Sequence, residues 1–577
     1  MKKYLFLIFA LVVVNQCFAQ WISEGNNRLY TLSMLAESAP DAVSAGNDGS
    51  YTISQDITIS QTDTLLLENS ASSIQVNPSI KILVNGTLQT ENRNTTLNII
   101  GDSQPDNHFS VTFDSASANV IENVKISECY RILMINSDVI IKKCEFLNFS
   151  NHVISYMNCN PLIQDCFFHD NAACAIQSAV NTDGCPKIIN NRFFNNVTSN
   201  SNNPQINIGP GTSDTIVISG NLIEGLNSDK SGGIGIANLY NPSVTNIILK
   251  DNIIKNNRYG YTQNGYRISS QIINNQIIDN YLETIPNNGG SGISIYGYDQ
   301  SNAAKLRNNL ITGNLWGVTA IYYNDIDMGT EDDFGYNVIY DNWNSGKEYE
   351  LFNNSNSDIS AVGNYWGHDN ADHVENVIYH KTDSAIYGMV NYLPIYVIEP
   401  SITSFSLLKE DNPCLESDVF GSFSAENDTI FLHIVELSSS AITNLKPRIT
   451  VPYGVMTDPD GAESINFETP FVITASTPHQ TTKGYVVVAD FALSVNNHEE
   501  SGFNIFPNPI VSNSFMVESS KIKDYVWTIY SMDGKTELSG VVKPGSNNID
   551  VAKISSGVYI LEIKDGKESY TNKIIIK

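Results

Sequence analysis

The chain has 577 residues, a formal net charge of −28 at pH 7 and a sequence pI near 4.6. This acidity argues against nucleic acid and against anionic membrane surfaces as partners, because their phosphates would be repelled. The length predicts several domains, although a stack of repeats can be long without dividing.

Residues 1–19 have the pattern of a secretory signal peptide. Lys2 and Lys3 form a positive n-region, an apolar run extends from Leu5 to Val14, and Ala19 precedes the expected cleavage site. A lipoprotein signal ending at Cys17 is the alternative, although the residues before it make a poor lipobox. The apolar run is too short to span a bilayer, so we expect an exported protein with no transmembrane segment in the mature chain.

Residues 20–50 are predicted to form an N-terminal cap. The segment Thr31–Ser38 has the pattern of a short amphipathic helix, and Pro40 ends it. Such a cover is needed because the first coil of a stack presents unpaired strand edges. Short strand patterns begin at Tyr51.

One six-residue phrase then recurs along the chain: Asn, any residue, an apolar residue, two further residues, and Asn. Full copies start at Asn191, Asn252, Asn275, Asn309 and Asn337, and looser copies start at Cys144, Cys166, Asn221 and Asn364. The mean step is about 27 residues, which is typical of stacked repeats.

Each copy follows a short β-branched run such as Ile216–Ile218, which predicts an all-β coil. We expect the Asn residues to turn corners in the left-handed conformation and to bond the copies above and below as a ladder. Cys144 and Cys166 would occupy the same ladder position. The pattern over 51–395 resembles the right-handed parallel β-helix of the pectate-lyase-like superfamily. Trp366 in the last copy is expected to cover the end of the core.

The mature chain keeps seven cysteines, and six of them lie between Cys129 and Cys185. An exported protein can form disulfides, whereas cysteines in a ladder position can be buried apolar fillers. The spacing does not decide between these two interpretations, nor does it give a connectivity.

Beyond the repeats, residues 396–495 show longer alternating strand patterns that predict an Ig-like β-sandwich. The tail, 501–577, carries the phrases Phe506-Pro507-Asn508-Pro509, Asp533-Gly534-Lys535 and Ser556-Gly557-Val558-Tyr559. These phrases resemble the C-terminal sorting domain of the type IX secretion system, which is a second small sandwich. The resemblance implies contact with that secretion machinery and a secreted or outer-membrane-surface location.

The β-helix resemblance implies action on polysaccharides. A lyase would need Ca²⁺ held by carboxylates and a basic side chain, and a hydrolase would need paired carboxylates. One loop crowds five carboxylates that could hold Ca²⁺ or could simply be solvated: Asp325, Asp327, Glu331, Asp332 and Asp333. Arg258, Arg267 and Arg307 are candidates to complete a lyase-like site. Asn181–Gly184 matches only the first motif of polygalacturonase-type hydrolases.

The strongest binding candidates are aromatic. Tyrosines follow the Gly-started strands of successive repeats, where equivalent positions should form a column on which sugar rings stack: Tyr240, Tyr266, Tyr296, Tyr298, Tyr322 and Tyr323. A polar group after the last repeat, which includes His368, His373 and His380, is expected to belong to the end cap.

The sequence therefore predicts a secreted or surface-attached β-helix protein that binds polysaccharide. Whether it also processes polysaccharide, as a lyase or a glycoside hydrolase, is left open by the residues. A non-catalytic adhesin or structural cell-surface protein is the alternative.

Overall fold

The computed structural model describes residues 20–178, 181–240, 242–299, 301–435, 442–478, 481–492, 502–566 and 569–577. The predicted signal peptide lies outside these residues. No helix within the described ranges is long and apolar enough to cross a membrane.

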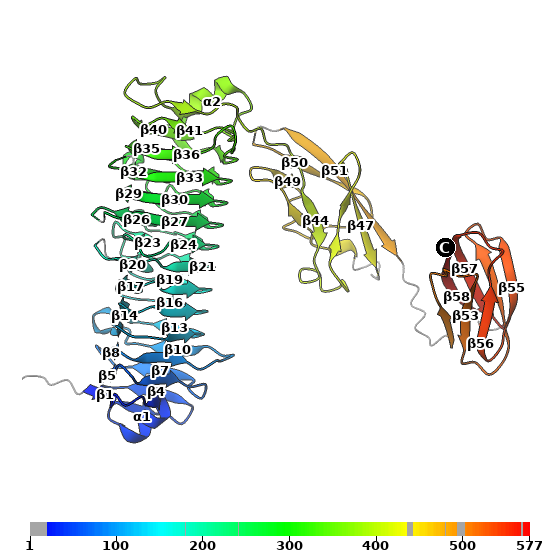
Figure 1. Ribbon diagram of the computed structural model, residues 1–577, viewed down its shortest axis with the longest axis horizontal. Coiled ribbons are helices and arrows are strands. Elements are labelled where there is room, and N and C mark those ends of the chain that lie inside the picture. Colours follow the sequence, from blue (N-terminus) through cyan, green and yellow to red (C-terminus); the bar gives the residue numbers. More distant parts are fainter. Residues whose placement is uncertain are drawn as a thin grey trace, which may run out of the picture. The chain divides into compact units, whose positions relative to one another are not determined.

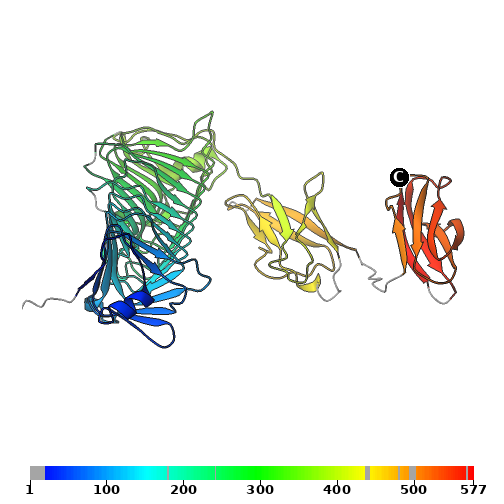
Figure 2. The same cartoon turned by 60° about the horizontal axis from the view of Figure 1, so that its bottom comes forward.

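Three long parallel sheets form the sides of a β-helix, stacked coil upon coil as Figures 1 and 2 show. Sheet A contains, in the described residues, β1 (Gln20–Ile22), β5 (Asp56–Ile59), β8 (Lys81–Val84), β11 (Phe109–Asp114), β14 (Cys129–Ile135), β17 (Ile154–Met157), β20 (Ile176–Ser178), β23 (Pro204–Ile208), β26 (Gly232–Asn238), β29 (Tyr261–Gly265), β32 (Ser291–Gly297), β35 (Trp316–Tyr322), β40 (Leu351–Ser355) and β42 (Ile378–Tyr379).

Sheet B follows sheet A along each coil. Its described strands are β2 (Leu29–Thr31), β6 (Thr64–Leu67), β9 (Thr87–Thr90), β12 (Asn119–Glu122), β15 (Val139–Lys142), β18 (Leu162–Gln164), β21 (Lys187–Ile189), β24 (Ile216–Ser219), β27 (Thr245–Lys250), β30 (Ile268–Ile273), β33 (Ala303–Arg307), β36 (Asp325–Asp327), β41 (Ile359–Ser360) and β43 (Val390–Asn391).

Sheet C completes the coil. Its described strands are β3 (Val43–Ala45), β4 (Ser50–Ile53), β7 (Ser73–Val76), β10 (Leu97–Ile100), β13 (Val124–Ser127), β16 (Glu145–Leu147), β19 (Phe167–His169), β22 (Arg192–Phe194), β25 (Leu222–Glu224), β28 (Ile253–Lys255), β31 (Gln276–Ile278), β34 (Leu310–Thr312) and β37 (Val338–Tyr340). The short η1 (Pro105–Asn107) and η2 (Pro286–Asn288) lie in loops, and β38 (Trp343–Asn344) and β39 (Lys347–Glu348) form a hairpin.

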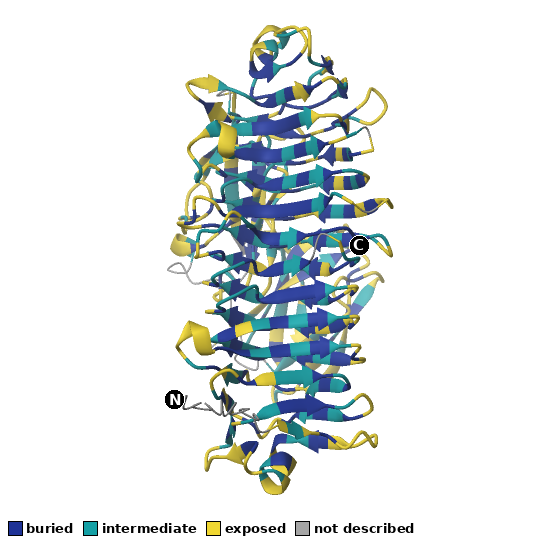
Figure 3. Ribbon diagram, turned by 90° about the vertical axis from the view of Figure 1, so that its left-hand side faces the viewer, coloured by how far each residue is buried: buried dark blue, intermediate teal, exposed yellow. Residues whose placement is uncertain are grey.

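The middle apolar residue of each phrase points into the coil, as predicted. Phe193, Ile254 and Ile277 are fully buried, and Phe168 stacks on Phe193 with ring centroids 4.9 Å apart. Figure 3 shows the result: buried strands and exposed turns. A continuous apolar core of this kind supplies most of the stabilisation of a solenoid, because each coil covers its neighbour.

Two amide ladders run along the coil. In the first, the Nδ2 of each Asn donates to the Oδ1 of the next, for example Asn252 to Asn275 at 2.9 Å and Asn275 to Asn309 at 3.0 Å. The second ladder contains Asn257 and Asn280, 3.1 Å apart. These ladders confirm the predicted mechanical role of the phrase.

The predicted corner conformation was wrong by one residue. The left-handed residues are those that precede the ladder positions, such as Asn190 (φ 55°), Asp251 (φ 56°) and Asn274 (φ 55°). The chain turns there, and the next residue then returns to negative φ and points its amide inward to the ladder. A residue in the left-handed conformation costs least when it is Gly, Asn or Asp, which explains the polar residues at these positions.

Cys144 and Cys166 continue the first ladder toward the N-terminus, as predicted. The backbone N–H of Cys166 donates to Asn191 Oδ1 at 2.9 Å, and that of Cys144 donates to Cys166 Sγ at 3.4 Å. All seven described cysteines are free, and six are buried. Burial raises the pKa of the Cys129 thiol above its ordinary value. The filler interpretation therefore holds, and the structure contains no disulfide among the described residues.

Both ends of the coil carry short helices. α1 (Leu32–Ser38) begins after Thr31, whose hydroxyl accepts from the backbone N–H of Met34 at 3.2 Å, and it matches the predicted cap helix. At the other end lies α2 (Ala371–Val377), and Trp366 is fully buried in the core of the β-helix, as expected.

After residue 400 the strands form smaller, mostly antiparallel sheets, consistent with the predicted Ig-like class. The first group contains β44 (Ser404–Leu407), β45 (Val419–Phe420), β46 (Ser422–Phe423), β47 (Thr429–Val435), η3 (Ile442–Asn444), β48 (Arg448–Thr450), β49 (Met456–Asp458), β50 (Phe471–Ser476) and β51 (Thr482–Ala492). The tail contains β52 (Phe503–Phe506), β53 (Ser514–Ser519), β54 (Tyr525–Ser531), β55 (Thr536–Val542), β56 (Gly545–Asp550), β57 (Gly557–Lys564) and β58 (Ser569–Ile576), around its own apolar core.

Candidate functional site

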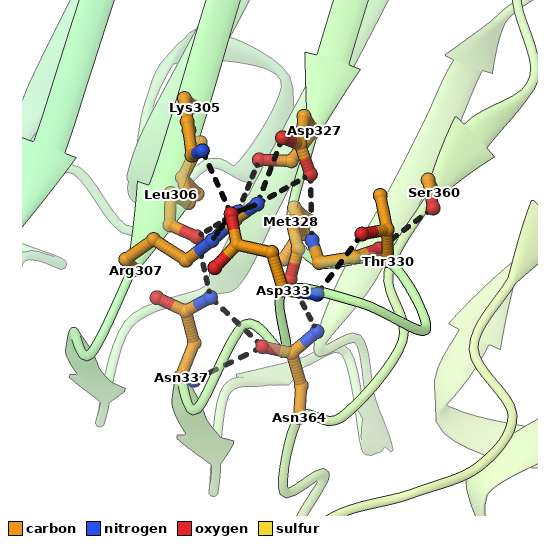
Figure 4. Close-up of polar contacts among 11 residues, drawn as sticks. Lys305, Leu306, Arg307, Asp327, Met328, Thr330, Asp333, Asn337, Ser360 and Asn364 are labelled. Atoms are coloured by element: carbon orange, nitrogen blue, oxygen red, sulfur yellow. Dashed lines mark hydrogen bonds and ion pairs between the residues drawn. The ribbon is translucent and has the colours of Figure 1, made fainter.

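The predicted acidic loop is built around Arg307, the last residue of β33 (Figure 4). Its Nη2 lies 2.8 Å from Asp327 Oδ2 and 2.9 Å from Asp333 Oδ2. Lys305 Nζ lies 2.7 Å from the same Asp333 oxygen. Hydrogen bonds from Arg307 and Lys305 lower the pKa of Asp333 to about 2. The guanidinium is buried, with its side chain 8% exposed.

This arrangement is a structural clamp that ties the turn after β36 to β33. Asp327 and Asp333, two of the five candidate calcium ligands, both pair with the guanidinium of Arg307. No group of three or more Asp, Glu, His or Cys side chains in the described ranges is arranged to hold a metal ion. Calcium binding by Asp325, Glu331 and Asp332 with these two residues stays a prediction.

The three candidate arginines do not converge. Arg307 lies on sheet B, whereas Arg267 is exposed at the turn before β30. Arg258 lies before β29 and donates to Asn202 and to the backbone carbonyl of Asn288. Of the three arginines, Arg307 alone joins the acidic loop, and a lyase-like role for this group stays a prediction.

Three of the six candidate tyrosines form a column at the ends of successive sheet A strands, and the other three stand in neighbouring rows. Gly265, Gly297 and Tyr322 pair in register as the last residues of β29, β32 and β35, so Tyr266, Tyr298 and Tyr323 follow at equivalent positions. Tyr298 and Tyr323 line a shallow hollow with Asp299 and Ser301. Tyr240, 76% exposed, follows β26 on the preceding coil.

Ring contacts join four of these tyrosines into one cluster. Ring centroids lie 5.0 Å apart for Tyr266 and Tyr298, 5.5 Å for Tyr298 and Tyr296, and 5.1 Å for Tyr296 and Tyr322. The pKa of Tyr296 is raised to about 12, mainly by burial and to a lesser extent by the hydrogen bond with Tyr322. Tyr322 is 53% exposed and has φ 64°, which is costly for a bulky residue. We call these four residues the tyrosine cluster.

A groove of about 350 Å³ lies on the outer face of sheet A beside this cluster. Its floor is a row of outward residues in register: Thr262, Ser294, Thr319 and Phe352. The next row contains Ile321 and Asn354, and Ile321 pairs with Tyr296. The tyrosine cluster therefore adjoins one side of the groove.

The other wall consists of Tyr259, Trp316 and the loop that contains η2. The indole N–H of Trp316 donates to the carbonyl oxygen of Pro286 at 3.1 Å, and the N–H of Gly290 donates to Arg258 O at 2.7 Å. Side chain and backbone thus hold the loop beside the floor. Tyr259 packs over Gly232, where any Cβ would clash with its ring.

Aromatic rings continue beyond the groove along sheet A. Trp316 contacts Phe352 at 5.1 Å and Tyr349 at 4.8 Å, and Phe352 contacts Tyr379 at 5.0 Å. All four side chains are half-buried, so parts of their rings face solvent. An aromatic wall above a floor of hydroxyl groups and an amide can stack and hydrogen-bond a polar ring compound.

The groove was not predicted from the sequence, although the repeats carry one signal of it. Thr262, Ser294 and Thr319 each stand two places after a repeat-opening glycine: Gly260, Gly292 and Gly317. Alignment of the repeats on these glycines would have placed the three hydroxyl groups in one outward row. Trp316 and the loop had no such signal, because the loop comes from one coil only.

The remaining candidates have structural roles. Asp183 accepts from the backbone N–H and the hydroxyl of Thr212 at 2.6 and 2.8 Å, which bridges adjacent coils. His380 is buried, with Nε2 3.1 Å from Glu375, and Nδ1 accepts from the N–H of Val390. These contacts support the end-cap interpretation of the histidines.

The fold and groove define a parallel β-helix protein with an aromatic-walled lateral groove. Residues 504–577 match the family described as a secretion system C-terminal sorting domain, and residues 260–372 match a β-helix family described as a protein of unknown function, DUF1565. The second match spans the groove. The sorting domain indicates secretion or display on the outer surface. Comparison with curated proteins gives no match.

Solved structures resemble the chain at the level of fold. The periplasmic alginate epimerase AlgG has 12% identity and a TM-score of 0.42, with 64% of this chain and 84% of that chain covered. The pectate lyase Pel9A has 12% identity and a TM-score of 0.20, with 56% and 70% covered. The tailspike gp49 of the Acinetobacter baumannii bacteriophage Fri1, a capsular polysaccharide depolymerase, has 10% identity and a TM-score of 0.27, with 96% and 78% covered. These values carry no argument about activity.

Proposed function

We propose that this chain is a secreted or surface-displayed protein that binds polysaccharide in the sheet A groove. The observation that carries the proposal is the groove itself, where Trp316 and Phe352 stand beside the hydroxyl groups of Thr262, Ser294 and Thr319. Sugar rings present apolar faces and hydroxyl edges, and this lining offers a partner for each.

The tyrosine cluster extends the proposed binding surface. Tyr298 and Tyr322 are exposed, at 39% and 53%, and Tyr296 adjoins the groove. A glycan that leaves the groove on this side would meet aromatic rings on consecutive coils, which are about 4.8 Å apart. Such a surface suits an extended chain better than a single sugar.

The proposal concerns binding, and it does not assign a reaction. The groove lining contains no carboxylate or imidazole, so it offers no side-chain general acid–base pair among the described residues. This feature favours the alternative of a non-catalytic surface protein over a hydrolase acting at this groove.

The test is binding of the purified chain to a glycan array, followed by calorimetry on any ligand found. We expect Trp316→Ala to weaken binding about tenfold or more, because central aromatic contacts dominate such interfaces. Tyr130→Ala is the matched control, since Tyr130 is an exposed aromatic (40%) on β14 of the same sheet.

Two results would overturn the proposal. One is the absence of binding to every glycan on the array. The other is equal binding by the wild type and Trp316→Ala, provided that circular dichroism shows the same fold. Release of reducing ends or of unsaturated products would assign catalysis, which would have to come from another surface.

A further inference from the structure

The groove lining is entirely uncharged. Every residue that lines it is aliphatic, aromatic, hydroxylic, amidic or glycine: Tyr259, Thr262, Pro286, Asn287, Asn288, Gly289, Ser291, Ser294, Trp316, Thr319, Ile321, Phe352 and Asn354. A carboxylate placed here would lose water and gain no opposite charge, which costs several kcal/mol for a buried ion.

The cations nearest to the groove are not part of its lining. Lys347 Nζ lies 5.0 Å from the ring centroid of Tyr349 and 5.6 Å from that of Tyr379. Arg258 is bonded to the carbonyl oxygen of Asn288, inside the loop that forms the wall. On sheet B, Arg307 and Lys305 are neutralised by Asp327 and Asp333. An anionic sugar is recognised through direct bonds to a guanidinium or ammonium group, and the lining presents neither.

The electrostatic surroundings add to this preference. The chain carries a formal net charge of −28, and Asp299 stands beside Tyr298 and Tyr323 at the hollow next to the tyrosine cluster. A polyanion approaching this side would be repelled at low ionic strength. A neutral chain would meet no such barrier.

We infer that the ligand of the groove is an uncharged glycan, recognised by aromatic stacking and by hydroxyl and amide hydrogen bonds. The inference rests on the proposed function, because it names the ligand class of the same groove. Neutral sugars need only donors and acceptors of modest strength, and Thr262, Ser294 and Asn354 supply both.

The test compares matched glycans that differ only in charge. Polygalacturonate and alginate are presented beside their carboxyl-reduced forms, in which each carboxylate has become a primary alcohol, together with neutral glucans, xylans, mannans and galactans. We expect binding to neutral members only, and an affinity that changes less than about twofold between 0.05 and 0.5 M NaCl, because no counterions are released.

A gain-of-function variant makes the test independent of the natural ligand. Ser294→Lys places one cation on the groove floor, and it should raise the affinity for the acidic glycan relative to its reduced form at least about threefold at low salt. Tyr130→Lys is the control, because it adds the same side chain to the same sheet outside the groove.

The outcomes separate the two proposals. Preference of the wild type for an acidic glycan, weakened by salt and lost in Trp316→Ala, would overturn the inference and leave the groove as the binding site. Binding to no glycan would overturn the proposed function and the inference with it. Neutral binding that Trp316→Ala leaves unchanged would overturn the assignment to the groove.

Discussion

The indole nitrogen of Trp316 donates a 3.1 Å hydrogen bond to the carbonyl oxygen of Pro286. This bond joins β35 of sheet A to the loop between β31 and β32. Trp316 therefore contributes its ring to the wall of the groove and also holds the loop that forms the rest of that wall. Loss of the ring and loss of the bond should therefore have separable effects.

Trp316→Phe keeps an aromatic ring and removes the donor. We expect faster amide hydrogen exchange at 286–290 and an affinity loss of about threefold to tenfold, because one neutral hydrogen bond contributes about 1 kcal/mol. Hydrogen–deuterium exchange with mass spectrometry checks the loop, and calorimetry checks the affinity. Unchanged exchange would show that Gly290 and Arg258 hold the loop without the indole.

Tyr322 should show a trade-off between stability and binding. Its left-handed backbone costs about 1–2 kcal/mol relative to glycine. A glycine would remove this cost, but it would also remove the ring contacts and give the unfolded chain more entropy to lose on folding, so the two effects oppose each other. We expect Tyr322→Gly to change the unfolding free energy by less than about 1 kcal/mol and to weaken glycan binding. Thermal unfolding and calorimetry measure the two effects. Tyr130→Ala, at an exposed tyrosine outside the groove and the tyrosine cluster, is the control for binding.

Glu350 should make the stability of the β-helix fall as the pH rises. Full burial raises the pKa of this carboxyl well above its ordinary value of 4.5, and Asn342 at the end of the second ladder donates to it. The folded protein therefore keeps a proton that the unfolded chain releases near pH 4.5. The unfolding free energy must then decrease above that pH.

Glu350→Gln removes this dependence and keeps the shape. Gln205 already fills an equivalent rung, since it accepts from Asn196 at 2.8 Å and donates to Asn257 at 2.9 Å. We expect the variant to be roughly 1–3 kcal/mol more stable at pH 8, with a smaller difference at pH 5. Denaturation at both pH values measures this. Glu348→Gln, which removes a half-buried neighbour's charge, should not reproduce the effect.

Cys166→Asn should stabilise the coil. A thiol is a weak acceptor, and Cys144 N lies 3.4 Å from Cys166 Sγ, whereas the amide rungs have distances near 2.9 Å. An Asn here could accept from Cys144 N and donate to Asn191. We expect a gain of about 0.5–1.5 kcal/mol, seen as a higher melting temperature. A lower melting temperature would mean that the surrounding apolar core cannot accommodate the amide.

Arg307→Met should loosen the turn after β36 and leave the groove intact. The substitution leaves Asp327 and Asp333 without their shared partner, at a cost of about 1 kcal/mol or less, because both carboxylates remain in contact with water. Because the pKa of Asp333 is lowered to about 2, its part of the stability is present above pH 3.8 and is lost as the pH falls through 2. This acid sensitivity should weaken in the variant. Lys305→Met, which removes the more exposed cation, should have a smaller effect.

The repeat made the fold predictable, because one phrase reports both a buried residue and a corner. Ile277 is buried and Asn275 bonds its copies for the reasons read from the sequence. The cap helix could also be predicted from the capping residue Thr31 and the following apolar spacing. The position of the left-handed residue could not, since Asn and Asp occur both at the corner and next to it.

The site was less accessible to prediction, because side chains far apart in sequence meet only when the register is known. The four tyrosines of the cluster were among the candidates, although only Tyr266 and Tyr298 stand at equivalent positions of their repeats. The acidic loop was predicted only from the number of carboxylates close together in the sequence. Its pairing with Arg307 could not be predicted, because that pairing requires the register between β33 and β36. The groove depended on an inserted loop, whose path no periodicity describes.

The amide ladder has one more consequence. Successive rungs are 23 residues apart from Asn252 to Asn275 but 34 apart from Asn275 to Asn309, and both pairs keep the same bond geometry. The longer step contains the loop with η2. The alignment of successive coils thus does not depend on the length of the loops between them. We therefore expect that a foreign loop grafted between Asn280 and Ser291 can change what the groove recognises without disturbing the β-helix.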